Sequence, residues 1–376
     1  MPVQTPYYTY DSTLFSRTIE AAKSEAACLP QAKIHLAVKS NSNARLIAIA
    51  AKAGLGADCV SGAEIAHCIN CQMPAHRIMF AGVGKTDEEI NLALDAGIGC
   101  FNVESVPELD VIQQLAVARH TIANVAFRIN PDVDAHTHAN ITTGLEANKF
   151  GISMADMIDV IRRAQSMSNI HYLGLHFHIG SQVLDMTCFR QLSLRINQLQ
   201  DQLEQAGITG TTSINVGGGL GIDYEHPELN PIPNFRDYFR AYADNLELRP
   251  GQSLHFELGR ALTAQCGRLI TRCVFVKQTA TKQFAIVDAG FTALIRPALY
   301  QAFHKIVNLT GQAEQRPLRT YDVVGPICES SDVFATDIEL HEVRRGDTLA
   351  ILSAGAYGFV MSSTYNLRAL PQEVVE

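Results

Sequence analysis

The sequence predicts a (β/α)₈ barrel, a TIM-like fold, followed by a second, mostly β domain. Short apolar runs alternate with helical patterns between residues 34 and 257, and eight such runs occur at even spacing. After Arg260 the helical period disappears, and short segments rich in β-branched residues replace it. Regular alternation of strands and helices is typical of a parallel barrel. A doubly wound open sheet is the competing topology, but it rarely contains so many evenly spaced strands.

The elements follow one another in a regular order. Residues 6–10 are rich in tyrosine and indicate a short strand, and Asp11 or Ser12 is a candidate cap for a helix that ends near Ala27. The barrel strands are predicted at residues 34–38, 56–60, 77–80, 99–103, 125–130, 172–178, 213–216 and 253–257. Helical patterns fill most of the gaps, at residues 43–53, 63–70, 86–96, 106–118, 154–166, 188–206 and 234–247.

The remaining sequence predicts a separate β domain. Short β-branched runs lie at residues 269–278, 283–288, 320–324 and 348–353. We therefore assign residues 13–257 to the barrel and residues 258–376 to a C-terminal β domain. The N-terminal strand, within residues 1–12, has no place in the eightfold count, so we expect it to join the β domain. The polar stretch 130–149 after the fifth strand is expected to be a long loop, and such loops are often lids.

The amino-acid composition argues against several classes of protein function. The chain has 376 residues, 47% hydrophobic and 18% charged, which is ordinary for a globular enzyme. Its net charge of −8 argues against a nucleic-acid or acidic-membrane partner. No apolar run reaches the length of a transmembrane helix, and residues 1–10 lack the pattern of a secretory signal. Nine cysteines without framework spacing indicate a reducing cytoplasm.

Lys39 is the residue around which the chemistry is expected to be organised. The apolar run 34–38 ends on this lysine, and a Ser-Asn-Ser-Asn stretch follows, in which Asn43 is a candidate helix cap. Burying a lysine at a strand end is costly because desolvation disfavours its charge. The same desolvation makes the amine a nucleophile suited to Schiff-base chemistry. The alternative is a lysine whose amine reaches solvent.

Polar or glycine-rich residues stand at the end of almost every predicted barrel strand. In barrels of this kind the active site lies at these ends. They are Lys39, Asp58, Arg128, the stretch from His178 to Ser181, the glycines 217–219, and Glu257 to Arg260. Consecutive glycines let backbone N–H groups close around an anion, and phosphate sites in barrels form after strands seven and eight. The alternative interpretation of this glycine run is a flexible turn.

A Schiff-base lysine, a phosphate cradle and a carboxylate on the last strand together suggest pyridoxal phosphate. Glu257 could keep the pyridine nitrogen protonated, which makes the ring an electron sink. His176 and His178 point to the same face of their strand, and His178, nearer the end, is the candidate for stacking on the ring. We expect His176 to be a core histidine.

Two cysteine motifs each have two possible interpretations. Cys68-x-x-Cys71 resembles half of a zinc site, but no second pair matches it and it lies in a helical pattern, so we expect no metal. Cys328 and Glu329 follow a predicted strand and a Gly-Pro turn. A thiol at such a place can be merely a buried small residue, but the neighbouring carboxylate makes that interpretation less convincing.

The motifs together resemble a known family. Three of them are Ala37-Val38-Lys39-Ser40-Asn41, His176-Phe177-His178-Ile179-Gly180-Ser181-Gln182 and Gly325-Pro326-Ile327-Cys328-Glu329-Ser330. Others lie at residues 57–64, 80–85, 101–105, 128–133, 148–151, 217–221, 296–300 and 354–358. Their order and spread over the chain resemble the fold-type III pyridoxal-phosphate decarboxylases of the alanine racemase-like fold. The resemblance is greatest to the diaminopimelate decarboxylases within the ornithine/diaminopimelate/arginine decarboxylase family.

This resemblance implies a role for each site residue. The implied catalytic residues are Lys39, which holds the cofactor as a Schiff base, Cys328, the proton donor, and His178, which stacks on the ring. The implied cofactor contacts also include Asp58, Ser181, Gly218, Gly219, Glu257, Gly259, Arg260 and Tyr357. The implied substrate contacts are Arg260, Arg296, Tyr300, Glu329 and Tyr357.

The resemblance also implies an activity and an assembly. The expected reaction is pyridoxal-phosphate-dependent decarboxylation of meso-2,6-diaminopimelate to L-lysine and CO₂, the last step of lysine biosynthesis. The expected assembly is a homodimer in which Cys328 and Glu329 act in the partner subunit's site. One departure is visible, because Leu258 stands where the family usually has proline. The alternatives are a decarboxylase of ornithine, lysine or arginine on the same fold, and a non-catalytic carrier of pyridoxal phosphate.

Overall fold

The computed structural model describes residues 3–29, 31–133 and 149–376. These residues form two compact units, each treated separately below. The barrel unit comprises Ile19–Gly221 and Asn234–Gly259, and the β unit comprises Met1–Thr18, Ile222–Pro233 and Arg260–Glu376. Most of the predicted loop 130–149 lies outside the described residues, because the description stops at Val133 and resumes at Lys149.

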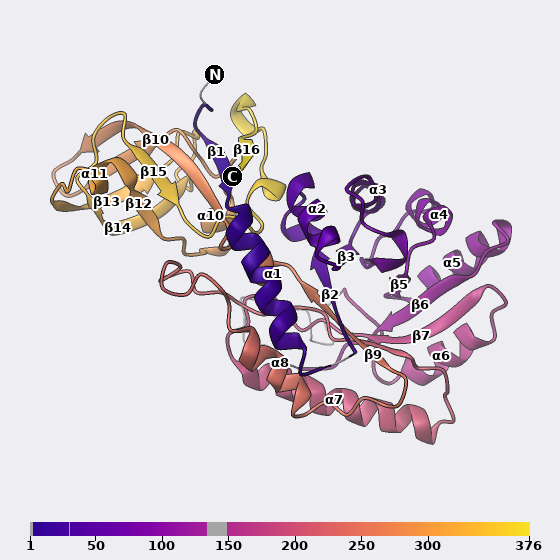
Figure 1. The fold of residues 1–376 in the computed structure, drawn as a ribbon. Coiled ribbons are helices and arrows are strands. Elements are labelled where there is room, and N and C mark those ends of the chain that lie inside the picture. The colour runs from indigo at the N-terminus through magenta and orange to yellow at the C-terminus, as the bar shows by residue number, and fades with distance from the viewer. Residues whose placement is uncertain (1–2, 30, 134–148) are drawn as a thin grey trace. The chain divides into compact units, whose positions relative to one another are not determined.

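Eight parallel strands close into a barrel in the order of the sequence, which confirms the predicted fold class (Figure 1). They are β2 (Ala32–Ala37), β3 (Gly56–Cys59), β4 (Ile78–Phe80), β5 (Cys100–Val103), β6 (Ala123–Arg128), β7 (Ile170–His176), β8 (Ser213–Asn215) and β9 (Ser253–Leu258). The ring closes because β2 pairs with β9, with Ile34 opposite Phe256. All eight lie at the predicted positions, with ends that differ by a few residues.

Helices alternate with these strands. They are α1 (Ser12–Ala26), α2 (Ala44–Lys52), α3 (Gly62–Asn70), α4 (Asp87–Ala96), α5 (Val106–Ala118), α6 (Met157–Gln165), α7 (Met186–Gln205) and α8 (Phe235–Ala243). Local sequence fixes several of their starts. The side chain of Asn43 accepts a hydrogen bond from Arg45 N–H, as the sequence predicts, and Thr86 forms a capping box with Glu89 at the start of α4.

Successive side chains of β9 point alternately into the barrel and toward the surrounding helices. The ring of Phe256 packs against Tyr238, Phe239 and Tyr242 of α8, with ring centroids 4.9–5.8 Å apart. Since successive residues of a strand point to opposite faces, His255 and Glu257 point into the barrel. This alternation places titratable side chains in the barrel interior, above and below one another.

The β unit contains an eight-stranded sheet in which β12, β15, β10, β11, β13 and β14 follow one another. Their bounds are β10 (Gly267–Gln278), β11 (Gln283–Val287), β12 (Ile306–Asn308), β13 (Leu318–Val324), β14 (Val333–His341) and β15 (Thr348–Ile351). The tyrosine-rich strand β1 (Tyr7–Tyr10) pairs with β10 and with β16 (Gln372–Val375) and so lies in this sheet. The sequence analysis did not predict β12, β14 or β16, because they are very short or rich in charged residues.

The segment Ile222–Pro233 belongs to the β unit although it lies inside the predicted barrel range 13–257. Side-chain hydrogen bonds explain this difference. Gln265 Nε2 donates to the carbonyl oxygens of Asp223 and Asn230 at 3.1 and 3.0 Å, and Lys305 Nζ lies 3.0 Å from Glu228. These partners are far apart in the sequence, so local periodicity does not predict them, although three prolines (Pro227, Pro231 and Pro233) mark the segment as irregular.

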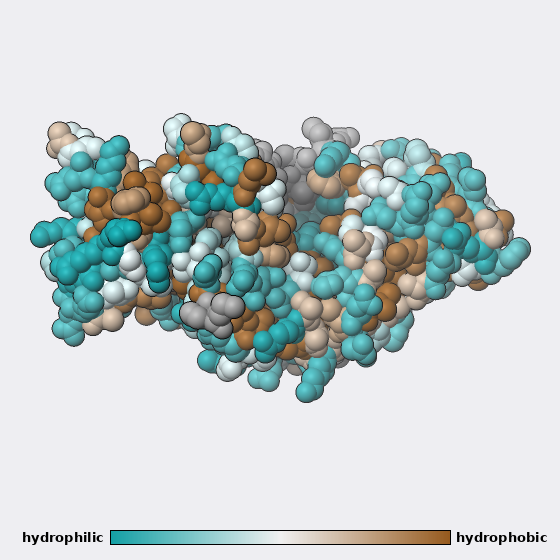
Figure 2. Space-filling view, turned by 90° about the horizontal axis from the view of Figure 1, so that it is seen from above, coloured by the Kyte–Doolittle hydropathy of each residue, from teal (hydrophilic) through white to brown (hydrophobic). Residues whose placement is uncertain are grey.

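The helices of the described residues were compared with the length and apolarity that a membrane span requires. Among the described residues, no helix is both long and apolar enough to cross a bilayer. In Figure 2, hydrophobic residues on the visible face lie in separate patches among hydrophilic ones.

Candidate active site

Lys39 and Asp58 meet at the C-terminal end of the barrel. Lys39 lies in a single 3₁₀ turn, η1 (Val38–Ser40), directly after β2, and Asp58 lies on β3. Nζ of the lysine donates to Oδ2 of the aspartate at 3.1 Å. Asp58 is buried, and its burial, with the nearby charge of Glu257, raises the pKa of its carboxyl to about 6 although Lys39 opposes the shift. The carboxyl of Asp58 therefore takes up a proton closer to neutral pH than an exposed aspartate does.

A buried cluster surrounds the carboxylate of Glu257 in the barrel interior. Its Oε1 accepts hydrogen bonds from the side-chain amides of Asn215, at 2.7 Å, and Asn102, at 3.2 Å. Its Oε2 lies 3.0 Å from Nε2 of His176. Burial by itself would raise the pKa of Glu257, but His176, Lys39 and His178 outweigh it, so the pKa lies below its ordinary value. The cluster holds an ionised carboxylate in the interior.

His178 lies just beyond β7, two residues after His176. Its Nδ1 accepts a hydrogen bond from Gly180 N–H at 3.2 Å, so the proton of the neutral ring is on Nε2. Burial, together with the charges of Lys39 and Arg128, lowers the pKa of His178 well below its ordinary value. The ring is therefore neutral. His176 is buried, as expected for a core histidine, but its contact makes it part of the Glu257 cluster.

The glycine run after β8 packs against the end of β9. The N–H of Gly217 donates to Asn215 Oδ1 at 2.9 Å, which ties the run to the Glu257 cluster. A Cβ atom on Gly218 would stand 2.0 Å from the carbonyl oxygen of Glu257, and Gly219 has a φ of +114°. Only glycine fits at these two positions, because a side chain would collide with β9 at Gly218 and would be strained at the positive φ of Gly219.

Two further predicted residues lie in loops at the same end of the barrel. Ser181 is half-buried in the loop after β7. Gly259 directly follows β9, and a Cβ atom there would lie 3.0 Å from Cβ of Ser40 in the turn that carries Lys39. The loop after β9 therefore reaches the turn after β2, as the closure of the barrel requires.

Arg128, predicted at a strand end, forms a buried ion pair with Glu104. Nη1 of the arginine lies 3.1 Å from both carboxylate oxygens of Glu104, at the end of β5. The guanidinium also stacks over the ring of Phe150, 4.5 Å from its centroid. Glu104 in addition accepts the backbone N–H of Gly82 at 2.9 Å, so this pair joins the loops after β4, β5 and β6.

In the β unit, two arginines converge on one tyrosine. Arg260 begins α9 (Arg260–Thr263) and Arg296 begins α10 (Arg296–Tyr300). Each donates from Nη1 to the hydroxyl oxygen of Tyr224, at 2.6 and 2.8 Å. Both arginines are buried. Since both guanidinium groups donate to the phenol oxygen, the same groups can donate to a carboxylate in its place.

His304 contacts both Arg296 and the ring of Tyr224, from which its own ring is 5.1 Å away. Nη1 of Arg296 donates to Nε2 of His304 at 2.8 Å, and the histidine donates from Nδ1 to the carbonyl oxygen of Leu352 at 2.9 Å. Burial, together with the charge of Arg296, lowers the pKa of His304 to about 3. The neutral ring is therefore an acceptor that fixes the guanidinium.

The remaining predicted residues of the β unit lie near its surface. Tyr357, half-buried with a φ of +56°, has its ring 5.0 Å from the guanidinium carbon of Arg260, and Tyr300 ends α10. Cys328 and Glu329 are exposed between β13 and β14. The N–H of Cys328 donates to Asn366 Oδ1 at 3.1 Å, and Glu329 accepts from the hydroxyl of Tyr365 at 3.1 Å.

Comparison with known proteins identifies the family. The family model described as "Pyridoxal-dependent decarboxylase, pyridoxal binding domain" matches residues 15–264. A diaminopimelate decarboxylase of Bacteroides thetaiotaomicron is 58% identical over 370 residues, 98% of this chain and 95% of that protein. The chain belongs to the pyridoxal-dependent decarboxylases.

Other relatives agree with this assignment. A diaminopimelate decarboxylase of Aquifex aeolicus is 40% identical over 372 residues, 99% of this chain and 86% of that protein. The crystal structure of diaminopimelate decarboxylase from Helicobacter pylori complexed with L-lysine superposes with a TM-score of 0.91 at 36% identity and covers 100% of this chain and 92% of that one. A lysine/ornithine decarboxylase of Vibrio vulnificus, 20% identical with a TM-score of 0.85, shows a shared fold alone.

The barrel residues fit the cofactor of this family. Pyridoxal phosphate needs an amine to bind its aldehyde, a carboxylate for its pyridine nitrogen and donors for its phosphate. Lys39, Glu257 and the glycine run provide these three groups at one end of the barrel. Oδ1 of Asp58 is buried and has no hydrogen-bond partner among the described residues, which leaves an acceptor for a bound group.

The sequence analysis missed five residues of these clusters: Asn102, Asn215, Glu104, Tyr224 and His304. The first two lie at inward positions near the ends of barrel strands, so strand alternation could have identified them. Glu104 directly follows a predicted strand and could have been found in the same way. Tyr224 and His304 carry no local signal, because their partners are 36 or more and 8 or more residues away.

Proposed function

We propose that the chain decarboxylates meso-2,6-diaminopimelate to L-lysine and CO₂ with pyridoxal 5′-phosphate, the last step of lysine biosynthesis. The observation that carries the proposal is the arrangement of Lys39, Asp58 and Glu257 at the C-terminal end of the barrel. Similarity to diaminopimelate decarboxylases over nearly the whole chain supports the choice of substrate.

The barrel residues hold the cofactor and prepare its surroundings. Pyridoxal phosphate, when bound, supplies a ring that accepts the electron pair left as CO₂ departs. Lys39 would hold the aldehyde carbon of the cofactor, and Asp58, whose pKa is raised to about 6, would accept and return a proton at Nζ of the lysine. Glu257 stays ionised and keeps a proton on the pyridine nitrogen, since His176, Asn102 and Asn215 fix its carboxylate.

Further residues are proposed to position the cofactor. The backbone N–H groups of Gly218 and Gly219, with Ser181, Gly259 and Arg260, bind the phosphate. The ring of His178 is neutral and stacks on the face of the cofactor, which excludes water from that face.

Residues of the β unit recognise the substrate. Arg260, Arg296 and Tyr300 bind a carboxylate, and the convergence of both arginines on Tyr224 supports this role. Tyr357, beside Arg260, contacts cofactor or substrate. Glu329 binds the distal amino group, and Cys328 donates a proton to Cα from its thiol.

We further propose that the active protein is a cytoplasmic homodimer with shared sites. Cys328 and Glu329 are exposed on the β unit, which makes them accessible to a second copy of the chain. In the dimer they complete the site of the partner subunit. A cytoplasmic location suits nine cysteines that are all free thiols. Neither nucleic acid nor a membrane is a partner in this proposal.

The principal alternative is a decarboxylase of ornithine, lysine or arginine. A carboxylate at the distal end of the substrate distinguishes diaminopimelate from these amino acids, and the arginine pair suits a carboxylate. The deciding experiment measures CO₂ release from meso-diaminopimelate, ornithine, lysine and arginine. Release from meso-diaminopimelate at much the highest kcat/KM is expected. A preference for one of the other amino acids would assign the alternative, and no release from any would favour a non-catalytic carrier.

A further inference from the structure

A second cavity lies at the other end of the barrel, where the strands begin. Its volume is about 830 Å³, which is in the range of small-molecule sites. Its lining includes the first residues of four strands, Ala32, Gly56, Ser213 and Ser253. Since all barrel strands are parallel, this cavity is at the end opposite Lys39 and is separate from the proposed active site.

The ionisable side chains that line this cavity are all basic. Its ionisable lining residues are Lys23, Lys33, His35, His76, Arg77 and His255, and no described lining residue is acidic. Nζ of Lys23 already donates to the carbonyl oxygen of Ala53 at 2.7 Å. The side chains of Lys33 and Arg77 have neither a hydrogen-bond nor an ion-pair partner within the described ranges. Arg77 is half-buried and has no counter-charge among the described residues that line the cavity.

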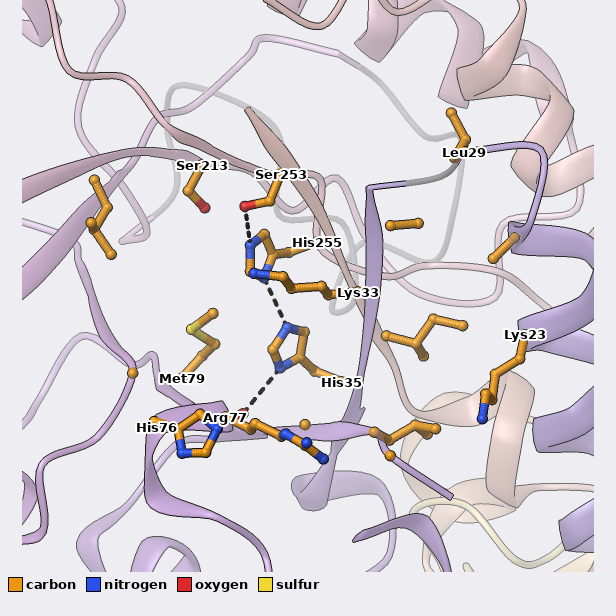
Figure 3. Close-up of a pocket in the computed structure, with 18 of the residues that line it drawn as sticks. Lys23, Leu29, Lys33, His35, His76, Arg77, Met79, Ser213, Ser253 and His255 are labelled. Atoms are coloured by element: carbon orange, nitrogen blue, oxygen red, sulfur yellow. Dashed lines mark hydrogen bonds between the residues drawn. The ribbon is translucent and has the colours of Figure 1, made fainter. Parts of the chain in front are cut away.

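Two stacked histidines form the wall of the cavity (Figure 3). His35 Nε2 lies 2.9 Å from His255 Nδ1, and the rings are 5.1 Å apart. The outer nitrogens reach the backbone oxygen of Arg77, at 3.3 Å, and the hydroxyl of Ser253, at 2.9 Å. A single direction of donation satisfies every nitrogen of two neutral rings: Ser253 to His255, His255 to His35, and His35 to the Arg77 carbonyl.

The hydrogen bonds of the histidine pair argue against a metal ion as the ligand of this cavity. A metal cation would need free histidine nitrogens or carboxylates, and the four ring nitrogens of this histidine pair are already used. Burial lowers the pKa of His35 to about 4, and the charge of Lys33 contributes, so the wall does not neutralise an anion by itself at neutral pH. The groups left to bind include the cations of Lys33 and Arg77, the exposed ring of His76 and the hydroxyl of Ser213, and each of them can donate a hydrogen bond.

We propose that this cavity binds a small oxyanion, a carboxylate or a phosphate, through Lys33, Arg77 and Ser213. A planar guanidinium and a flexible ammonium at one cavity, without a protein carboxylate between them, match the oxygens of such an anion. The histidine pair fixes the backbone of Arg77 and thereby the start of β4. This binding site does not depend on the reaction proposed above.

The test uses isothermal titration of the cofactor-loaded protein with inorganic phosphate and, separately, with succinate, at constant ionic strength. We expect saturable binding of at least one of them. Lys33→Met and Arg77→Met should each weaken it by roughly tenfold, the scale of one charge-assisted hydrogen bond. Tighter binding of phosphate would assign a phosphate ligand, and tighter binding of succinate would assign a carboxylate.

Two matched variants locate the ion. Arg190→Met removes an exposed arginine on α7 that does not line the cavity, and Arg296→Met removes the arginine proposed to bind substrate. Both should bind the anion as the wild type does. Absence of saturable binding, unchanged affinity in both cavity variants, or loss of binding in Arg296→Met would each overturn the proposal. Unchanged thermal midpoints and cofactor absorbance would show that the variants are folded.

Discussion

His176 and Glu257 meet inside the barrel from strands that are not neighbours, with Nε2 3.0 Å from Oε2. Strand β8 lies between them in the ring and contributes Asn215, whose amide donates to the same carboxylate at 2.7 Å. A buried carboxylate with this many donors remains ionised, because each donor favours the charged form. The arrangement therefore presents a fixed negative charge in the interior of the barrel.

Glu257→Gln tests this charge. Glutamine keeps the size and much of the hydrogen bonding but cannot be ionised. We expect kcat to fall roughly 10- to 100-fold, the equivalent of one charge-assisted hydrogen bond of about 1.5–3 kcal/mol. The cofactor should still be retained on Lys39, as measured by borohydride reduction and mass spectrometry. Wild-type kcat in this variant would mean that the Glu257 carboxylate has no part in the reaction.

Strand periodicity predicted the barrel and most of its site because both depend on local sequence. Lys39, Asp58 and Glu257 were identified from their positions at strand ends, and the closed barrel brings these ends together. His176 shows where local sequence is insufficient. A buried histidine on a strand looks the same whether it meets an apolar neighbour or a carboxylate from a strand 81 residues away in the sequence.

The β unit contains further contacts that local sequence does not predict. Tyr224 reaches Arg296 across 72 residues, and the segment that carries it is rich in proline, which indicates a loop but not the unit to which the loop belongs. The short strands β12 and β16 have three and four residues, and each pairs with a strand that is distant in the sequence, β15 and β1 respectively. Such contacts are products of tertiary structure, and single-sequence patterns contain no record of them.

Lys39→Ala should abolish covalent retention of the cofactor. The wild-type protein is expected to be yellow and to carry a borohydride-reducible group on Lys39, since this lysine lies at the barrel end beside Asp58. The variant should carry none after reduction, as peptide mass mapping will reveal. Lys33→Met, at the opposite end of the barrel, is the control and should label like the wild type. A reduced adduct at another lysine of Lys39→Ala would refute the central assignment.

Arg296→Ala should weaken substrate binding more than cofactor binding. Loss of a hydrogen bond to a charged group costs about 1.5–3 kcal/mol, so KM for diaminopimelate should rise roughly 10- to 100-fold. Arg268→Ala, which removes an exposed arginine on β10, serves as the control and should leave KM unchanged. Equal losses of cofactor and substrate affinity would mean that Arg296 has a structural role, and the pair of kinetic and absorbance titrations distinguishes the two cases.

Glu64 should make the protein less stable as the pH rises. Burial raises the pKa of this carboxyl to about 7, although its bond from Val60 N–H, at 2.7 Å, opposes the shift. The folded state therefore holds a proton that the unfolded state releases above its lower pKa. Stability from this group is lost as the pH rises from about 4.5 to about 7, by roughly 1–3 kcal/mol after allowance for partial exposure.

Glu64→Gln isolates this effect because the amide oxygen can still accept from Val60 while the side chain cannot ionise. Thermal midpoints of the wild type and the variant should converge at low pH and separate as the pH rises, with the variant the more stable. Glu20→Gln, an exposed glutamate on α1, should follow the wild type. If Glu64→Gln shows the same dependence on pH as the wild type, the carboxyl titrates at its ordinary pKa.

Mixing two inactive variants tests whether the active site is shared between subunits. Lys39→Ala removes the cofactor lysine of the barrel, and Cys328→Ala removes an exposed thiol of the β unit. Each homodimer should be severely impaired. In a heterodimer with shared sites, one site carries both defects and the other carries none. Random exchange places half of the dimers in this class, so about a quarter of wild-type activity should return if the sites act independently. Activity that stays at the level of the single variants, after mass spectrometry has shown exchange, would mean that each site is built from one chain.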